Sequence, residues 1–283
     1  MFIQKRSVSF AIVGLVYLLA TIVGLYIYDV LSYDVWLNIL IADVVATVFV
    51  FIFSLVFKNA SVYDPYWSVQ PIVIVVAISF KVKFTLITFL ILLVVCLWGI
   101  RLTANWAYTF HGLKYQDWRY TMLGEKTKSF YPIINFVGIH LVPTLVVYLA
   151  VMPAVTVLLL NPKFNALSLL GVAVSLFAVS LQTVSDIEMH KYRKNKTTTF
   201  IRVGLWKYSR HPNYLGEILM WWGVGIFALI NTAFNWWTLT GAIVNTLLFV
   251  FVSIPMAENK QGQKEGFQEY KRQTHVLLPL PKK

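Results

Sequence analysis

Apolar stretches long enough to cross a lipid bilayer recur along almost the whole chain, and they leave few folds open. Inside hydrocarbon every backbone N–H and C=O group must be paired within the protein, which only helices and closed barrels achieve. A spanning helix needs about 20 apolar residues, whereas a spanning strand needs about half as many. The sequence therefore predicts an all-α polytopic bundle of about eight transmembrane helices, over residues 7–28, 36–57, 67–80, 84–105, 131–160, 165–188, 212–231 and 236–257.

Two of these stretches depart from the ordinary length of a span. Residues 67–80 are short, so this segment is expected to be tilted or re-entrant. Residues 131–160 are over-long and hold Pro143 and Pro153. A proline inside a helix removes a hydrogen bond and kinks the helix, so we expect a kink or break there.

Composition excludes the soluble classes that a chain of 283 residues would otherwise suit. Hydrophobic residues make up 58% of the chain and charged residues 13%, with a mean hydropathy of +0.69. The single cysteine, Cys96, lies inside an apolar stretch, which excludes an intrachain disulfide and argues against a thiolate metal site. Neither a His-Glu-x-x-His motif nor a Cys-x-x-Cys motif is present, so no metal is expected.

The basic residues indicate how the chain is oriented. The net charge is +12, and an N-terminus in the cytoplasm puts all basic residues except Lys81, Lys83 and Lys163 on the cytoplasmic side. Lys and Arg favour that side in membrane proteins, so we assign the charge to this asymmetry and to membrane lipids, and expect no nucleic-acid partner. Both termini are then cytoplasmic, together with the polar segments 106–130, 189–211 and 258–283.

The most unusual stretch is Gly204-Leu-Trp-Lys-Tyr-Ser-Arg-His-Pro-Asn-Tyr-Leu-Gly-Glu217, which leads into an apolar span. Pro212 suits the first turn of a helix, and Asn213 and Glu217 then lie four residues apart on one side of it. A carboxylate that enters an apolar span is costly, so Glu217 indicates a functional site. The alternative is that Glu217 and the preceding Arg-His pair only satisfy one another at a helix end.

A second polar stripe leaves the membrane at the end of the sixth apolar stretch. On a continuing helix Gln182, Asp186, His190 and Arg193 fall on one side. The stripe joins a strongly basic loop, and Arg side chains clamp phosphates while carboxylates and amides hold ribose hydroxyls or a carboxamide. The pattern predicts a site for a phosphate-bearing cofactor. The alternative, a basic loop that only contacts anionic lipid headgroups, explains the charge but not the buried acids and amides.

Residues near the third stretch supply candidates for proton transfer. Asp64 precedes Pro65 in an aromatic segment, and an apolar setting would raise the pKa of its carboxyl group so that it could donate a proton. The alternative for Asp64 is a helix N-cap. Arg101, at the end of the fourth stretch, is either a cofactor ligand or a side chain that snorkels toward the headgroups. Asp43 has no partner that the sequence identifies.

These motifs resemble those of the steroid 5α-reductase-like family, within its bacterial branch, and the Arg-His-Pro-Asn-Tyr-Leu-Gly-Glu segment is similar to the signature of membrane sterol reductases. The matching residues are Ser185-Asp186, Arg193, Gly204-Leu205-Trp206, Asn213 and Glu217. The resemblance implies a seven-helix reductase core preceded by an extra N-terminal helix, and NADPH held by Asp186, Arg193, Asn213, Glu217 and Arg101. We divide the chain into N-terminal transmembrane helices (1–60) and a catalytic membrane domain (61–283).

The substrate side departs from the family pattern. The family's catalytic carboxylate lies in a Gln-Glu-Leu-Pro-Ser segment, and Tyr63-Asp64-Pro65 stands at the corresponding place. The family's active-site tyrosine is replaced by Trp98 or Gly99. The resemblance therefore supports the cofactor site more strongly than the substrate site.

A second family shares part of the pattern. The Arg-His-Pro-x-Tyr-x-Gly string also occurs in isoprenylcysteine and phospholipid methyltransferases, which use S-adenosylmethionine, and Glu258 and Tyr270 fit their ending. A methyltransferase of this type is the alternative function. Asn213 and the basic loop favour the reductase, because the two ligands differ by several negative charges.

We therefore predict an integral multi-pass membrane reductase, similar to 3-oxo-5α-steroid 4-dehydrogenases, that transfers hydride from NADPH to the C=C bond of a lipophilic enone. The substrate, steroid-like or another lipid, is expected to enter from the bilayer. Asp64 is the predicted catalytic acid, with Tyr66 in support. The predicted cofactor residues, on the cytoplasmic face, are Arg101, Gln182, Asp186, His190, Arg193, Arg202, Tyr208, Arg210, His211, Asn213, Tyr214, Glu217, Glu258 and Tyr270.

Overall fold

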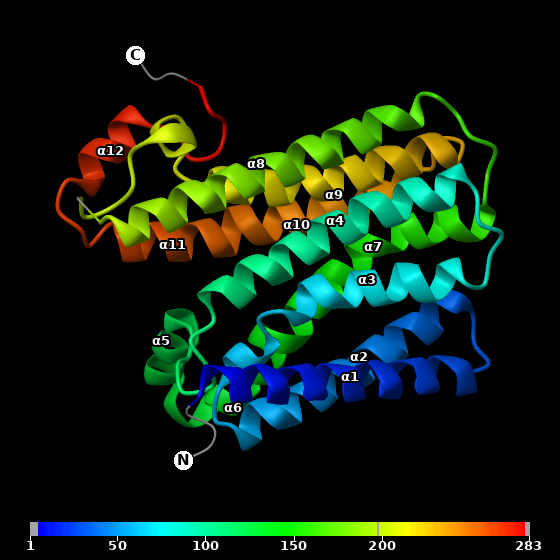
Figure 1. Cartoon of the computed structure of the whole chain (residues 1–283), viewed down its shortest axis with the longest axis horizontal. Helices are drawn as coiled ribbons and strands as arrows, with labels where there is room; N and C mark the ends of the chain where they lie inside the picture. The colour runs from blue at the N-terminus through cyan, green and yellow to red at the C-terminus, as the bar shows by residue number, and fades with distance from the viewer. Residues whose placement is uncertain (1–4, 197, 281–283) are drawn as a thin grey trace.

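A computed structural model describes residues 5–196 and 198–280, and over these residues the chain is helical without a β-strand. Figure 1 shows long helices that run roughly parallel to one another. The α-helices are α1 (Arg6–Val30), α2 (Val35–Val56), α3 (Tyr66–Ser79), α4 (Leu86–Thr109), α5 (Trp118–Thr127), α6 (Tyr131–Ile134), α7 (Val142–Leu160), α8 (Ser168–Lys194), α9 (Pro212–Asn231), α10 (Thr240–Leu248), α11 (Ile254–Gln261) and α12 (Phe267–Gln273).

Within the described residues, seven helical segments are long and apolar enough to cross a membrane. The predicted all-α membrane bundle is confirmed, and the chain is an integral multi-pass membrane protein. α3 has 14 residues and is the short segment that the sequence anticipated. Two of the seven segments are composite: α6 continues into α7 through the π-helix Asn135–Leu141, and α10 continues into α11 through the π-helix Phe249–Ser253.

The π-helix before α7 has a cause in the sequence. Pro143, the second residue after it, lacks the N–H that would bond to the carbonyl group four residues earlier. A local change to wider helical turns accommodates this missing bond. The predicted irregularity in the fifth stretch is therefore present at Pro143, whereas Pro153 lies inside α7, which continues to Leu160.

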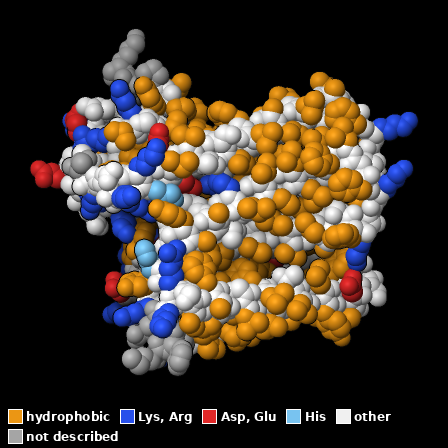
Figure 2. Space-filling model, viewed as in Figure 1, with side chains coloured by type: hydrophobic (Ala, Val, Ile, Leu, Met, Phe, Trp, Pro, Cys, Tyr) orange, Lys and Arg blue, Asp and Glu red, His pale blue; other side chains and the backbone are white. Residues whose placement is uncertain are grey.

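The polar segments gather at one end of the bundle. Figure 1 shows α5, α12 and the turn between α8 and α9 at the end where α1 begins. Figure 2 shows most Lys and Arg side chains on the viewed face at that same end. The apolar face between the two ends is what a bilayer would contact. The side of the membrane on which each end lies stays a prediction.

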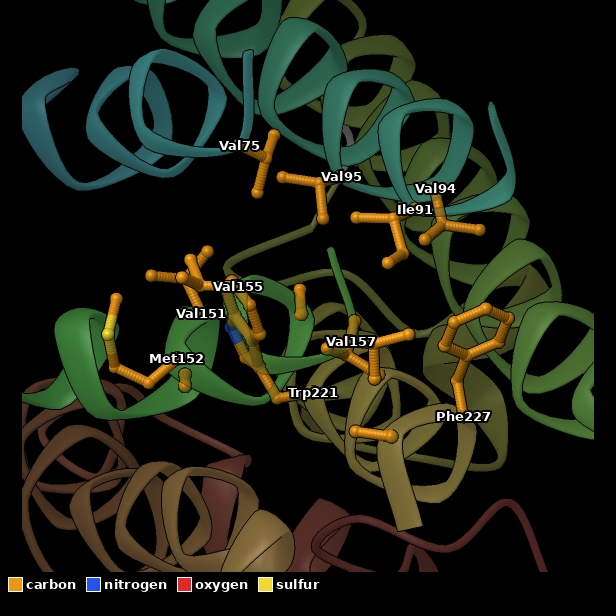
Figure 3. Close-up of a cluster of buried hydrophobic side chains, with 14 of the residues drawn as sticks. Val75, Ile91, Val94, Val95, Val151, Met152, Val155, Val157, Trp221 and Phe227 are labelled. Atoms are coloured by element: carbon orange, nitrogen blue, oxygen red, sulfur yellow. The ribbon is translucent and has the colours of Figure 1, made fainter. Parts of the chain in front are cut away.

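The main core lies where α3, α4, α7 and α9 meet (Figure 3). Val95 of α4, Val151 and Val155 of α7, and Trp221 of α9 are at most 1% exposed. Figure 3 shows these side chains directed toward a common centre. This core fixes α4 against α9, and both helices carry residues of the candidate site.

Small residues let α8 and α9 pack very closely. A Cβ atom on Gly223 would lie 2.2 Å from Ser175 Oγ and 2.7 Å from the Ser175 backbone N, and one on Gly171 would lie 2.6 Å from the Gly223 carbonyl oxygen. Close backbone approach through small residues is the usual way in which membrane helices associate. The contact aligns the polar stripe of α8 with the first turns of α9.

We expect Gly223→Val to separate α8 from α9 and to destabilise the protein by several kcal/mol, because the added side chain meets backbone atoms that cannot move away. The measurement is the thermal midpoint of the detergent-solubilised protein. Gly14→Val is the control, since nothing lies within 4 Å of a Cβ atom built there. Equal midpoints for the two variants would contradict the close packing.

Candidate active site

Glu217 lies at the centre of a buried hydrogen-bond network between α4, α8 and α9, and is 4% exposed. Its Oε2 accepts from Gln182 Nε2 at 2.7 Å and from Trp98 Nε1 at 2.9 Å. Its Oε1 accepts from Trp221 Nε1 at 3.1 Å. Trp221 lies one turn after Glu217 on α9, so both side chains leave the helix on the same side. Three N–H donors hold this carboxyl group, as its burial requires.

Arg101 connects this network to the polar stripe of α8. Its Nη2 donates to Gln182 Oε1 and its Nη1 donates to Asp186 Oδ2, both at 2.7 Å. α8 continues without a break to Lys194, as the sequence predicted, which places the two acceptors on successive turns. Snorkelling alone does not describe Arg101, because its guanidinium group is largely buried between two helices.

His190 extends the stripe toward the end of the bundle. Its Nε2 lies 2.7 Å from Asn105 Oδ1, and its ring lies 4.4 Å from the ring of Tyr108. Asn105 is one turn after Arg101 on α4. Arg101 and Asn105 on α4 therefore face Asp186 and His190 on α8.

A chamber of about 360 Å³ opens beside this contact, toward α5 and α11. Asn105 belongs to its wall, and so does Tyr214, whose ring stacks on His211 at 5.1 Å. Asp64 lies in the wall too. The chamber is lined by Tyr63, Asp64, Trp67, Leu102, Asn105, Trp106, Thr109, Asp117, Trp118, Arg119, Tyr120, Leu123, Gly138, Ile139, Pro143, Tyr214, Leu248, Val252, Ser253, Met256 and Ala257. Aromatic and aliphatic side chains with a few polar groups are typical of small-molecule sites.

Asp64 meets a tyrosine in this chamber, but not the one that the sequence indicated. Tyr120 donates its hydroxyl hydrogen to Asp64 Oδ1 at 2.7 Å. Tyr66 instead donates to Asp43 Oδ1 at 2.9 Å and lines a different cavity. Asp64 is not a helix N-cap either, because Pro65 holds that position in α3. Burial raises the pKa of Asp64 to about 6, against the opposing effect of Arg119.

This shift predicts how stability depends on pH. An aspartate in an unfolded chain has a pKa of about 3.9, so the folded protein binds the Asp64 proton more tightly. The free energy of unfolding should therefore fall as pH rises from about 4 to about 6, and change no further through this group above that range. Asp64→Asn should lose this slope. Thermal midpoints measured across these pH values test it, and an unchanged slope in the variant would contradict it.

Arg210, His211 and Glu258 form a separate cluster that fastens the C-terminal part of the chain. Arg210 Nε donates to Glu258 Oε1 at 2.8 Å and its Nη2 donates to Glu258 Oε2 at 3.2 Å. Its Nη1 donates to the backbone carbonyls of Lys271 and Thr274. His211 Nε2 lies 3.0 Å from Glu258 Oε1. We call this cluster the C-terminal clasp, and the arginine in it is fully occupied by protein groups.

The remaining predicted residues lie around these clusters. Tyr270 donates its hydroxyl hydrogen to the Trp206 backbone carbonyl and so supports the clasp. Asn213 Oδ1 is buried and has no hydrogen-bond partner among the described residues. The exposed predicted residues at this end are Arg193, Arg202 and Tyr208.

Sequence reasoning missed three contacts: those of Trp98 and Trp221 with Glu217, and that of Tyr120 with Asp64, although Trp98 was noted at the place of the family's tyrosine. Trp221 stands four residues after Glu217, so helical spacing was an available signal for that contact. Trp98 lies 119 residues from Glu217 and Tyr120 lies 56 residues from Asp64, so no local spacing indicates either pair.

Comparison with known proteins assigns the family. Residues 50–274 match the family described as "Protein of unknown function (DUF1295)". The chain belongs to this family. The DUF1295 match covers Asp64 and every predicted cofactor residue, from Arg101 to Tyr270.

Three curated proteins are similar to this DUF1295 chain. An uncharacterized protein of Schizosaccharomyces pombe is 26% identical over 167 residues, which is 50% of this chain and 48% of that protein. The 3-oxo-5-alpha-steroid 4-dehydrogenase 1 proteins of Macaca fascicularis and Homo sapiens are 29% and 28% identical over 122 residues, 42% of either chain. The chain thus spans less than half the length of these relatives. No solved structure matches it.

The motifs indicated a resemblance to the steroid 5α-reductase-like superfamily, and these similarities confirm it. They relate the chain distantly to membrane oxidoreductases. None of them favours a methyltransferase.

Proposed function

We propose that this DUF1295 protein is a membrane reductase that uses NADPH to saturate the C=C bond of a lipophilic enone. The distant similarity to 3-oxo-5-alpha-steroid 4-dehydrogenases supports an oxidoreductase. One structural observation carries the rest of the proposal. A single chamber has Asp64 in its wall together with Asn105 and Tyr214, and these two contact His190 and His211 of the predicted cofactor site.

Predicted cofactor residues outside the chamber wall fit an anionic dinucleotide, and Asn213 and Arg101 directly precede the wall residues Tyr214 and Leu102. Asn213 Oδ1 and Arg101 Nε are buried without a hydrogen-bond partner among the described residues. Such an amide oxygen suits the N–H of a carboxamide, since a buried acceptor left without a donor is costly. The exposed Arg193 and Arg202 would bind phosphates. Bound there, NADPH would supply the hydride.

The chain's own residues position the substrate and hold a proton. The Tyr120 hydroxyl orients the Asp64 carboxyl group, which would donate its proton to the carbonyl oxygen of the enone as hydride reaches the β-carbon. The resulting enol would then tautomerise, with a proton added at the α-carbon and one lost from the oxygen, to give the saturated ketone. A pKa of about 6 lets Asp64 act as an acid near neutral pH. Apolar walls that include Trp67, Leu102 and Ile139 exclude water from the reacting groups.

We propose in addition that this site faces the cytoplasm. The support is the basic asymmetry of the sequence, which assigns the end with α5 and α12 to that side. The substrate would then reach the chamber from the bilayer, and the cofactor from the aqueous side.

The test is a thermal-shift titration of the purified protein with NADPH, NADH and S-adenosylmethionine in parallel. We expect stabilisation by NADPH above NADH, because only NADPH carries a 2′-phosphate, and loss of this difference in Arg193→Ala. Lys191→Ala is the matched control, an exposed basic residue two positions earlier on α8. Stabilisation by S-adenosylmethionine alone would overturn the proposal.

A further inference from the structure

A second cavity lies on the other side of α3, away from the chamber. It is a groove of about 310 Å³ between α1, α2 and α3, which we call the α1–α3 groove. Figure 2 shows the surface hollowed between α1 and α3, on a face where many apolar side chains lie between the two charged ends. Its walls are mainly aliphatic residues and small residues such as Gly24 and Ala77. A groove in the side of the bundle is open to molecules dissolved in the bilayer.

A polar cluster stands in this apolar groove. Asp43 and Gln70 line it and are 5% and 6% exposed. Tyr66 donates to Asp43 Oδ1 at 2.9 Å, and Gln70 Nε2 donates to Asp43 Oδ2 at 2.7 Å. In this arrangement the Gln70 amide nitrogen faces Asp43, and the amide oxygen points away from it. Gln70 Oε1 is then left buried without a hydrogen-bond partner among the described residues.

We propose that the α1–α3 groove binds a neutral lipophilic alcohol from the bilayer, whose hydroxyl group donates to Gln70 Oε1. The carbonyl oxygen of Gln70 accepts hydrogen bonds only, and the two Asp43 oxygens already serve as acceptors. A hydroxyl group supplies the missing donor. A ketone or an acyl chain does not, so this ligand differs in kind from the enone proposed for the chamber.

The charges at the groove support a neutral ligand. Lys81 and Asp29 line it and pair with each other at 2.9 Å, and Lys81 Nζ also lies 4.3 Å from the centre of the Tyr28 ring. The ammonium group thus already has a carboxylate and an aromatic face as partners. The volume lies at the lower end of the range for small-molecule sites, which suits a small apolar ligand.

The experiment is photolabelling of the full chain in lipid nanodiscs, without NADPH, by a diazirine analogue of farnesol. We expect labelled peptides from α1 and α3, and competition by farnesol. Farnesyl methyl ether cannot donate a hydrogen bond and should compete about tenfold less well, because Gln70 Oε1 stays without a partner. Equal competition by alcohol and ether, or labelling confined to other helices, would overturn the inference.

Two variants complete the test. Gln70→Leu removes the acceptor and should abolish the difference between alcohol and ether. Ala77→Phe fills the groove without touching the polar cluster and should prevent labelling, which keeps the inference testable if Gln70→Leu does not fold. Leu18→Phe, at a position of α1 that is 58% exposed, is the matched control and should label normally. The cofactor titration tests the reductase separately, because no NADPH is present here.

Discussion

Glu217→Leu is expected to lower the free energy of unfolding by at least about 3 kcal/mol, because three buried N–H donors lose their acceptor together. Trp98, Trp221 and Gln182 would each be left facing an apolar side chain. Arg101 would also lose order, since Gln182 holds one of its guanidinium nitrogens. The thermal midpoint of the detergent-solubilised protein should therefore fall by several degrees, with or without cofactor.

Two further variants make this expectation specific. Glu217→Gln keeps the shape and one oxygen acceptor, so its loss of stability should be clearly smaller than that of Glu217→Leu. Glu265→Leu removes an exposed acid and should leave the midpoint unchanged. A wild-type midpoint in Glu217→Leu would mean that Glu217 has no structural role and serves ligand binding alone.

Arg210→Met should release the C-terminal segment from the bundle. The side chain is buried and holds Glu258 through two nitrogens, and it also binds backbone carbonyls at the end of α12. Removal of one partner from a buried ion pair costs about 3–5 kcal/mol, because the other charge stays buried alone. Limited trypsin digestion should then cleave rapidly after Lys264, since local opening exposes the backbone there.

Arg210→Lys and Arg272→Met serve as comparisons. Lysine keeps the charge but not the planar fork, so Arg210→Lys should give cleavage at an intermediate rate. Arg272 is exposed on α12, and Arg272→Met should digest like the wild type. If Arg210→Met is as resistant as Arg272→Met, the clasp does not hold the C-terminal segment.

Much of the fold could be predicted from the sequence because only helices and closed barrels can span the hydrocarbon core of a membrane. The apolar stretches gave the positions of most helices within a few residues, as for 36–57 against Val35–Val56, whereas α8 ends at Lys194, beyond the predicted 165–188. The short third stretch and the irregularity at Pro143 also followed from local chemistry. Contacts between side chains on different helices could not be predicted in this way. The packing of the whole bundle decides which faces of α4 and α9 meet.

Contacts of the candidate site between residues close in the sequence could be predicted. Contacts between residues far apart in the sequence could not. Gln182, Asp186 and His190 form a stripe because helical spacing alone places them on one side of α8. The choice between Tyr66 and Tyr120 as the partner of Asp64 depends on how the segment between α4 and α5 folds back. The orphaned amide oxygen of Gln70 depends on the position of Asp43, which lies 27 residues away.

The C-terminal clasp has a consequence for how the protein is made. Arg210 lies two residues before α9 (Pro212–Asn231), yet its partners are residues 258, 271 and 274, which follow it by 48 residues or more. During synthesis the N-terminal part emerges and inserts first. The arginine must therefore stay in contact with water or lipid phosphate until residues 258 to 274 have been synthesised. The clasp can therefore form only after α9, α10 and α11 have been synthesised, and a nascent chain that stops before residue 258 lacks every partner of Arg210 named here.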